Sequence, residues 1–249
     1  MLPYHSFISW KLGPLTIQSF GLMMALGFLA AIYLFAKQFK TEKERDIAYN
    51  IGIIAIVFGV LGSRLMFVAQ NPGAMSSPWA FFNFWEGGLS WFGGFFAAVV
   101  ACAIYMRLKG LDFWVMADKL APSITLGHAF GRLGCILGDG GHVGKLTTMP
   151  WGFDVNGEIR HVTAWYEMIG LLILFCGLIL ARKKLKGMHK GFMFGLYLVG
   201  YSVIRFVSDF FRVDPTYFGL TMAQYFCIAI FIAGTGLVVM NSVRKTKKN

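Results

Sequence analysis

The sequence predicts an all-α polytopic integral membrane protein with about seven transmembrane helices, and three observations support this fold class. The 249 residues are 57% hydrophobic and only 14% charged, and the mean hydropathy is +0.61. Such values are typical of integral membrane proteins. The apolar residues gather in seven stretches, most of them close to the roughly 20 residues that cross a bilayer. Little sequence remains outside these stretches, so we expect one membrane-embedded domain over residues 1–249.

The predicted spans follow one another along the whole chain. They cover residues 16–36, 48–70, 90–106, 114–138, 163–181, 191–211 and 220–241. The third is short, and the fourth contains Pro122 and several polar residues, so these two are the least regular spans. The longest polar connection is 139–162. The amino-terminal segment lacks the basic start and the small-residue cleavage site of a secretory signal.

The net charge of +11 admits either a nucleic-acid partner or a membrane topology signal, and its distribution favours the second. Fifteen of the 23 basic residues fall on one side of the seven-span arrangement. They are Lys37, Lys40, Lys43, Arg45, Arg107, Lys109, Arg182, Lys183, Lys184, Lys186, Lys190, Arg244, Lys245, Lys247 and Lys248. The positive-inside rule then predicts an outside amino terminus and a cytoplasmic carboxyl terminus. We expect membrane lipids as neighbours and no nucleic acid.

Three arginines lie inside predicted spans: Arg64, Arg132 and Arg205. Each costs roughly 2.5–3.5 kcal/mol at the centre of a membrane helix, so each needs a compensating partner. An anionic group held at membrane depth would supply one. The sequence therefore predicts a charged internal site.

A polar stripe accompanies Arg205. Tyr201, Arg205, Ser208, Asp209 and Arg212 recur at helical spacing and fall within about 100° of one another. A polar stripe on a lipid-embedded helix must face protein or a watery cavity.

The run 131–152 contains a second group of candidate residues. We expect it to leave the fourth span and to become a glycine-rich loop whose backbone turns sharply and offers amide hydrogens to an anion. Its glycines include Gly131, Gly134 and Gly138, and Asp139 and His142 add titratable groups.

Six blocks in the chain resemble the prolipoprotein diacylglyceryl transferases of bacterial membranes, in the order of that family. They are QSFGLMMALGFLAA, GVLGSRLMFV, WEGGLSWFGG, ADKLAPSITLGHAFGRLG, RHVTAWYE and LVGYSVIRFVSDFFR, followed by GLTMAQ. The resemblance implies seven spans in the bacterial cytoplasmic (inner) membrane. It also implies transfer of diacylglyceryl from phosphatidylglycerol to the lipobox cysteine thiol of lipoprotein precursors, with release of glycerol phosphate. No metal and no organic cofactor are expected.

The resemblance also suggests the site residues. Arg132 matches the family's GR-G-N signature, Tyr201 and Arg205 match its Tyr-x-x-x-Arg pair, and Asp209 and Arg212 match its acidic-Phe-Phe-Arg block. The residue types suit the reaction, because guanidinium groups stabilise a phosphate both when it is bound and when it departs.

The chain departs from the family at two of these positions, and the first departure leaves the proton acceptor unassigned. Phe92 stands where the family has a histidine, and Cys135 stands where it has an asparagine. The candidate bases are His142, Asp139 and His161, in that order, or the cations alone favour the thiolate. Two alternatives therefore stay open: a related transferase with a different acceptor, or a non-catalytic lipid-binding or transport protein.

Several candidates have a structural explanation beside the functional one. Glu167 either contacts substrate or pairs with a buried arginine, and Arg64 either binds substrate or pairs with an acidic residue such as Asp118. His128 is interpreted as a packing histidine. The predicted substrate-binding set is Arg64, Gly131, Gly134, Gly138, His161, Glu167, Asp209 and Arg212. The four cysteines show no paired spacing that favours disulfides or a zinc site.

Overall fold

The computed structural model describes residues 2–3, 7, 9–12, 15–74, 78–82, 88–138, 142–184 and 189–246. The chain forms two compact units. The first contains Met1–Ala31 and Ala117–Asn249, and the second contains Ile32–Met116. Each unit is described by itself below.

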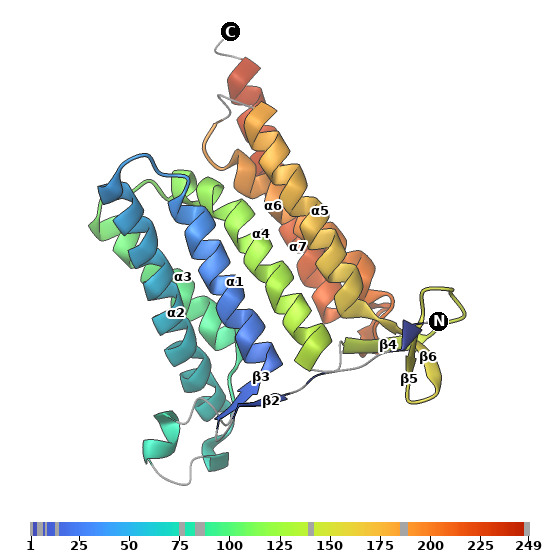
Figure 1. Ribbon diagram of the computed structural model, residues 1–249. Helices are drawn as coiled ribbons and strands as arrows, with labels where there is room; N and C mark the ends of the chain where they lie inside the picture. The colour runs from blue at the N-terminus through green and yellow to red at the C-terminus, as the bar shows by residue number, and fades with distance from the viewer. Residues whose placement is uncertain are drawn as a thin grey trace. The chain divides into compact units, whose positions relative to one another are not determined.

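Seven helices in the described residues account for all seven predicted spans (Figure 1). They are α1 (Ser19–Ala36), α2 (Glu42–Gln70), α3 (Trp91–Leu108), α4 (Phe113–Gly138), α5 (Thr163–Lys184), α6 (Phe192–Asp209) and α7 (Met222–Thr246). Six of them are long and apolar enough to cross a membrane, namely all except α4. The helix α4 has 26 residues, including Asp118, Lys119 and Arg132, and is more polar. The prediction of an all-α multi-pass membrane protein is confirmed.

Side-chain caps explain where two of the helices begin. At α2, the hydroxyl of Thr41 accepts from the amide of Glu44 at 3.3 Å, and the Glu44 carboxylate accepts from the amide of Thr41 at 3.3 Å. At α7, Thr221 and Gln224 exchange the same two bonds at 3.1 and 3.0 Å. Such reciprocal caps satisfy amide groups that the first helical turn leaves without partners.

The second unit is built around a close pair of helices, α2 and α3. A Cβ added to Gly62 would lie 2.6 Å from the carbonyl oxygen of Gly93, and a Cβ added to Gly94 would lie 2.9 Å from that of Gly59. Only glycine allows two helix backbones to approach so closely, as small residues do at interfaces of membrane helices.

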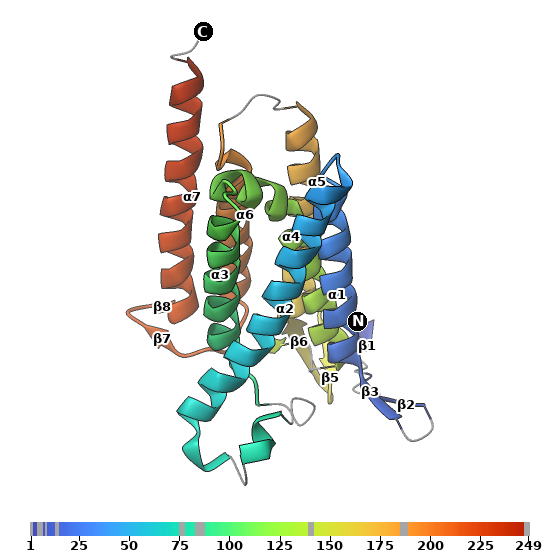
Figure 2. The ribbon, with the colours of Figure 1, turned by 90° about the vertical axis from the view of Figure 1, so that its left-hand side faces the viewer.

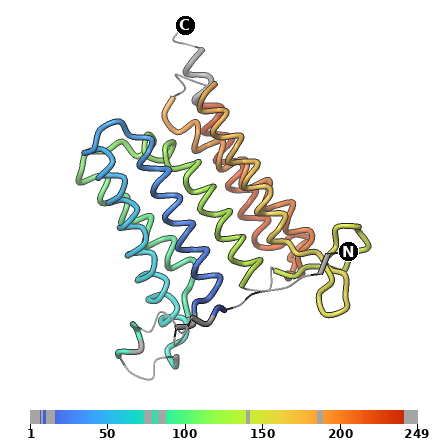
Figure 3. Tube along the Cα trace, viewed as in Figure 1, coloured from blue at the N-terminus to red at the C-terminus, as the bar shows by residue number. Residues whose placement is uncertain are grey.

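In the first unit, α6 packs against both α5 and α7 (Figures 2 and 3). Glycines again set the helix separation. A Cβ on Gly195 would lie 3.1 Å from the Gly234 carbonyl oxygen of α7, and a Cβ on Gly127 of α4 would lie 3.2 Å from the Gly27 carbonyl oxygen of α1. Within this unit, polar side chains of α4, α5 and α6 also contact one another.

Short strands occupy the connections, which the sequence analysis had treated as loops. A four-stranded sheet has the order β1-β5-β6-β4, with β1 (Leu2–Pro3), β4 (Val143–Leu146), β5 (Phe153–Val155) and β6 (Glu158–Val162). It lies where α4 ends and α5 begins (Figure 1). Two hairpins, β2 (Ser9–Leu12) with β3 (Leu15–Gln18) and β7 (Thr216–Tyr217) with β8 (Leu220–Thr221), precede α1 and α7.

Candidate functional site

Glu167 joins the two arginines of the predicted site. Its Oε2 lies 2.8 Å from Nη2 of Arg132, and its Oε1 lies 2.7 Å from Nη1 of Arg205. The Glu167 side chain is 1% exposed, and each arginine side chain is 15% exposed. Three helices contribute one group each: α4 gives Arg132, α5 gives Glu167 and α6 gives Arg205. Glu167 therefore does pair with buried arginines, and its contact with substrate stays a prediction.

Asp209 extends this arrangement along α6. Its Oδ1 lies 2.9 Å from Nη2 of Arg205 and 3.6 Å from Nε of Arg212, and its Oδ2 accepts from the hydroxyl of Thr221. Arg212 is also paired with Asp214, at 2.6 Å. Because Thr221 caps α7, this bond couples the end of α6 to the beginning of α7. We call Arg132, Glu167, Arg205, Asp209, Arg212 and Asp214 the charge cluster.

The end of α6 differs from its prediction. The helix stops at Asp209, and the amides of Phe210, Phe211 and Arg212 then bond to carbonyls three residues earlier. Arg212 thus lies in a turn after the helix, and the predicted stripe from Tyr201 to Arg212 is shorter by this residue. The turn still directs Arg212 towards Asp209 because the two residues are only three apart.

Arg132 has an unused donor in the charge cluster, whereas Glu167 has none of its capacity left. Nε of Arg132 is buried and has no hydrogen-bond partner among the described residues. Ser208, one turn from Arg205, adds a hydroxyl that donates to Oε1 of Glu167 at 3.3 Å. The carboxylate of Glu167 is thus fully engaged, whereas Arg132 keeps a donor for a further acceptor.

An aromatic stack lies beside the charge cluster. The rings of Tyr197 and Tyr201 are stacked with centroids 6.0 Å apart, and the ring of His128 is 5.2 Å from that of Tyr201. His128 precedes Arg132 by one turn of α4. The charges of the charge cluster act on both the imidazole and the Tyr201 hydroxyl. From the sequence, His128 was interpreted as a packing histidine with no part in the site. Its i, i+4 relation to Arg132 was the available signal.

His161 lies in β6 within an aromatic contact. Its Nδ1 is 2.7 Å from the hydroxyl of Tyr166, and its ring is 4.8 Å from that of Phe211. Burial lowers the pKa of His161 below its ordinary value, because an imidazolium loses hydration there. The neutral ring is therefore favoured in the folded state.

The connection between α4 and α5 is tied to the end of α6. The amide of Lys145 donates to the Phe211 carbonyl at 2.9 Å, and its ammonium donates to the Phe210 carbonyl at 2.9 Å. A Cβ on Gly144 would lie 2.1 Å from the oxygen of Phe211, so only glycine fits. The carbonyl of His142 accepts from the hydroxyl of Thr163 at 2.8 Å. These contacts hold β4 against the turn that contains Arg212.

The sharp backbone turn predicted at Gly131, Gly134 and Gly138 is wrong, whereas their part in substrate binding stays a prediction. All three residues are helical and belong to α4, where the amides already donate within the helix. Their role is helix packing on α1: an added Cβ would lie 3.1 Å from Cβ of Met23 at Gly134 and 2.8 Å from the backbone nitrogen of Phe20 at Gly138. Asp139 lies outside the described residues.

In the second unit, Arg64 holds the segment after α2. It is buried, its Nε donates to the Phe81 carbonyl at 3.0 Å, and its Nη1 donates to the Gly88 carbonyl at 3.1 Å. The suggested acidic partner has another role in the first unit. There, the Asp118 carboxylate accepts from the amides of Gly191 and Phe194 at 2.7 and 2.8 Å, at the beginning of α6.

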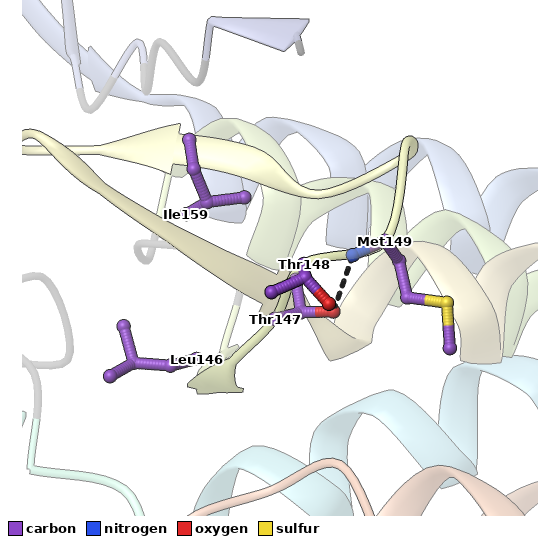
Figure 4. A pocket seen from close by; sticks show the side chains of 5 residues that line it. All are labelled: Leu146, Thr147, Thr148, Met149 and Ile159. Atoms are coloured by element: carbon purple, nitrogen blue, oxygen red, sulfur yellow. Dashed lines mark hydrogen bonds between the residues drawn. The ribbon is translucent and has the colours of Figure 1, made fainter.

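A shallow hollow of about 430 Å³ lies on the strand connection (Figure 4). Its lining is Leu146, Thr147, Thr148, Met149 and Ile159. No residue of the charge cluster lines it. The hollow is thus neutral, and the charged chemistry lies elsewhere in the first unit.

Comparisons with known proteins identify the family. The sequence profile described as prolipoprotein diacylglyceryl transferase matches residues 7–240. A phosphatidylglycerol–prolipoprotein diacylglyceryl transferase of Bordetella avium (strain 197N) is 31% identical over 268 residues, covering all of both chains. The proteins of the same name from Legionella pneumophila (strain Lens) and Methylococcus capsulatus (strain Bath) are each 30% identical. They align with 95% and 99% of this chain and with 98% and 100% of their own lengths. The chain therefore belongs to the prolipoprotein diacylglyceryl transferase family.

Proposed function

We propose that this protein transfers the diacylglyceryl group of phosphatidylglycerol to the cysteine thiol of lipoprotein precursors and releases glycerol phosphate. Relatives that align over nearly their whole length carry this activity in their names. Six long apolar helices agree with a substrate that is itself a lipid. We further propose that residues 1–249 act as one transferase domain in the bacterial cytoplasmic membrane.

The observation that carries the proposal is the Arg132–Glu167–Arg205 bridge. Two guanidinium groups from different helices are held by one carboxylate that is 1% exposed. A buried carboxylate shared in this way fixes both arginines before any ligand arrives, so less side-chain order is lost on binding. The unpartnered Nε of Arg132 supplies a donor for a phosphate oxygen.

The chemistry follows from these groups. The thiolate attacks the glyceryl carbon that bears the phosphate ester, the new carbon–sulfur bond forms, and the carbon–oxygen bond to phosphate breaks. Negative charge then grows on the leaving glycerol phosphate. Fixed cations at that position stabilise the transition state more than the ground state, which is the requirement for catalysis. Tyr201 lies one turn before Arg205 and supplies a hydroxyl for the headgroup.

The supporting residues have separate tasks in this proposal. Asp209 is paired with both Arg205 and Arg212, and these ion pairs hold the end of α6 in place. Lys145 and Gly144 hold β4 against the turn that follows α6. The roles of His142 and Asp139 as catalytic residues, and of His161 and Arg64 in substrate binding, remain predictions.

The test uses the purified full-length chain, phosphatidylglycerol vesicles and a synthetic lipobox peptide, with mass spectrometry of the peptide. We expect a diacylglyceryl mass gain with the wild type and a loss of at least about 100-fold in rate in Arg132→Ala and Arg205→Ala, the scale of losing one transition-state donor. Arg107→Ala, an exposed arginine of α3, is the matched control and should retain the wild-type rate. No mass gain with the wild type would overturn the proposal.

A further inference from the structure

The proposed reaction needs a group that accepts the thiol proton, and the carboxylates of the charge cluster suit this task poorly. Glu167 accepts from Arg132, Arg205 and Ser208. Asp209 is paired with arginines and accepts from Thr221. The oxygens of both carboxylates are therefore already engaged by other donors, and a thiol proton could reach them only if those contacts were broken.

Unlike these carboxylates, the side chain of His128 is not engaged by a hydrogen-bond donor among the described residues. No described residue forms a hydrogen bond with its imidazole, whose contact is the ring of Tyr201 at 5.2 Å. It lies one helical turn from Arg132, on the side of α4 that meets α5 and α6. The available nitrogen of its imidazole has a lone pair that can accept a proton, which is what a general base requires.

The charges around His128 come from every helix that meets it there. Arg132 belongs to its own helix, Glu167 to α5, and Arg205 to α6, which also contributes the Tyr201 hydroxyl. The arginines favour the incoming thiolate, and Glu167 offsets the charge of an imidazolium once it forms. The Tyr201 hydroxyl also has no hydrogen-bond partner among the described residues, so it is available to the same ligand.

His161 and the position of the family's histidine are less suited. The Nδ1 of His161 is already engaged by the hydroxyl of Tyr166 at 2.7 Å. Phe92, in the second unit, has no group that accepts a proton and is exposed. A base beside Arg132 would also lie close to the cations that hold the phosphate ester, which brings the thiol and the carbon that it attacks together in one site.

We propose that His128 is the general base of this protein, an inference that rests on the proposed function. The lone pair of a His128 ring nitrogen takes the thiol proton while sulfur bonds to the glyceryl carbon. The electrons of the broken carbon–oxygen bond leave with glycerol phosphate, whose charge Arg132 and Arg205 receive. The proton then passes from the imidazolium to the departing phosphate, which returns His128 to its neutral form.

The experiment compares the full-length wild type with His128→Gln and His128→Asn between pH 6 and pH 9.5, in the peptide assay described above. His189→Gln, a histidine in the connection before α6, is the matched control. We expect a loss of about 10²–10⁴-fold at pH 7 in both variants, with the KM for phosphatidylglycerol within about twofold of the wild type. The loss should shrink about tenfold per pH unit up to the thiol pKa of about 8.5, because the thiolate then forms without a base.

The outcomes separate the two proposals. If the wild type forms product and the folded His128 variants keep the wild-type rate, the role of His128 is overturned and the proposed function stands. A loss that stays constant across the pH range, or a KM that rises instead of a kcat that falls, would also overturn it, because it would indicate a packing or binding role. No product from the wild type would refute the proposed function itself. The unfolding midpoints of the variants, measured in detergent, show that folded proteins are compared.

Discussion

Replacement of Glu167 by glutamine is the sharpest perturbation of the first unit. The substitution keeps the shape of the side chain but removes the one negative charge that lies within 2.8 Å of both Arg132 and Arg205. Two cations would then face each other across an amide that is almost fully buried. Neither arginine can lose its charge, so the cost falls on folding.

The size of the effect follows from burial. A unit charge pair at about 4 Å is worth about 4 kcal/mol at an effective dielectric constant of about 20, and Glu167 makes two such pairs. Part of this attraction only offsets the desolvation of three charges, and breaking a buried pair by removing one partner costs about 3–5 kcal/mol in practice. We therefore expect Glu167→Gln to lower the free energy of unfolding by about 3–5 kcal/mol.

The assay is a reversible unfolding titration in mixed micelles, followed by the peptide assay on the folded fraction. Glu158→Gln is the matched control, because its ion pair with Arg160 is 55% and 28% exposed on the two sides. That control should change stability by less than about 1 kcal/mol. If Glu167→Gln proves no more destabilising than Glu158→Gln, the reasoning about a buried three-charge bridge is refuted.

Three further predictions concern pH, packing and topology. Because burial lowers the pKa of His161 in the folded state, its stability contribution is complete above about pH 6.5, the ordinary pKa of histidine, and is lost as the pH falls towards the lowered value. The unfolding midpoint of His161→Gln should therefore fall less between pH 7 and pH 5 than that of the wild type, and an equal fall would contradict this. Gly144→Ala should destabilise by about 1–3 kcal/mol, because the new Cβ would meet the Phe211 oxygen at 2.1 Å. Gly177→Ala in α5, where nothing lies within 4 Å, should be neutral or stabilising, and equal effects in a thermal unfolding series would refute the packing argument. A fluorescent-protein fusion to the carboxyl terminus should fluoresce, since the basic residues predict a cytoplasmic end, and a dark fusion that is nevertheless expressed would contradict that topology.

The helices were predictable because hydropathy alone specifies them. Each of the seven predicted stretches overlaps one helix, with ends that differ by a few residues. Lipid leaves the backbone few alternatives to a helix, so composition is a strong signal in a membrane protein. The strands β4, β5 and β6 were not predicted, because short paired segments outside the bilayer have no comparable hydrophobic signature.

The charge cluster was predicted only in part. The buried arginines stood out because each is costly in an apolar span, and Glu167 was correctly weighed as a partner for them. The shared geometry, in which one carboxylate serves both arginines, depends on how α4, α5 and α6 pack, and no local pattern encodes it. The glycines show the opposite error. Gly131, Gly134 and Gly138 were expected to turn the backbone, yet their spacing of three and four residues is that of a helix face in contact with α1.

The central claim is that the protein performs a group transfer and does not merely bind lipid. The most direct measurement is a quantitative time course of the wild type with phosphatidylglycerol and the lipobox peptide, in which the thioether-linked peptide and the free glycerol phosphate are both counted. We predict that the two products appear together, one glycerol phosphate for each modified peptide, and that neither appears when the peptide cysteine is replaced by serine. Retention of phosphatidylglycerol by the protein with neither product formed would contradict the claim.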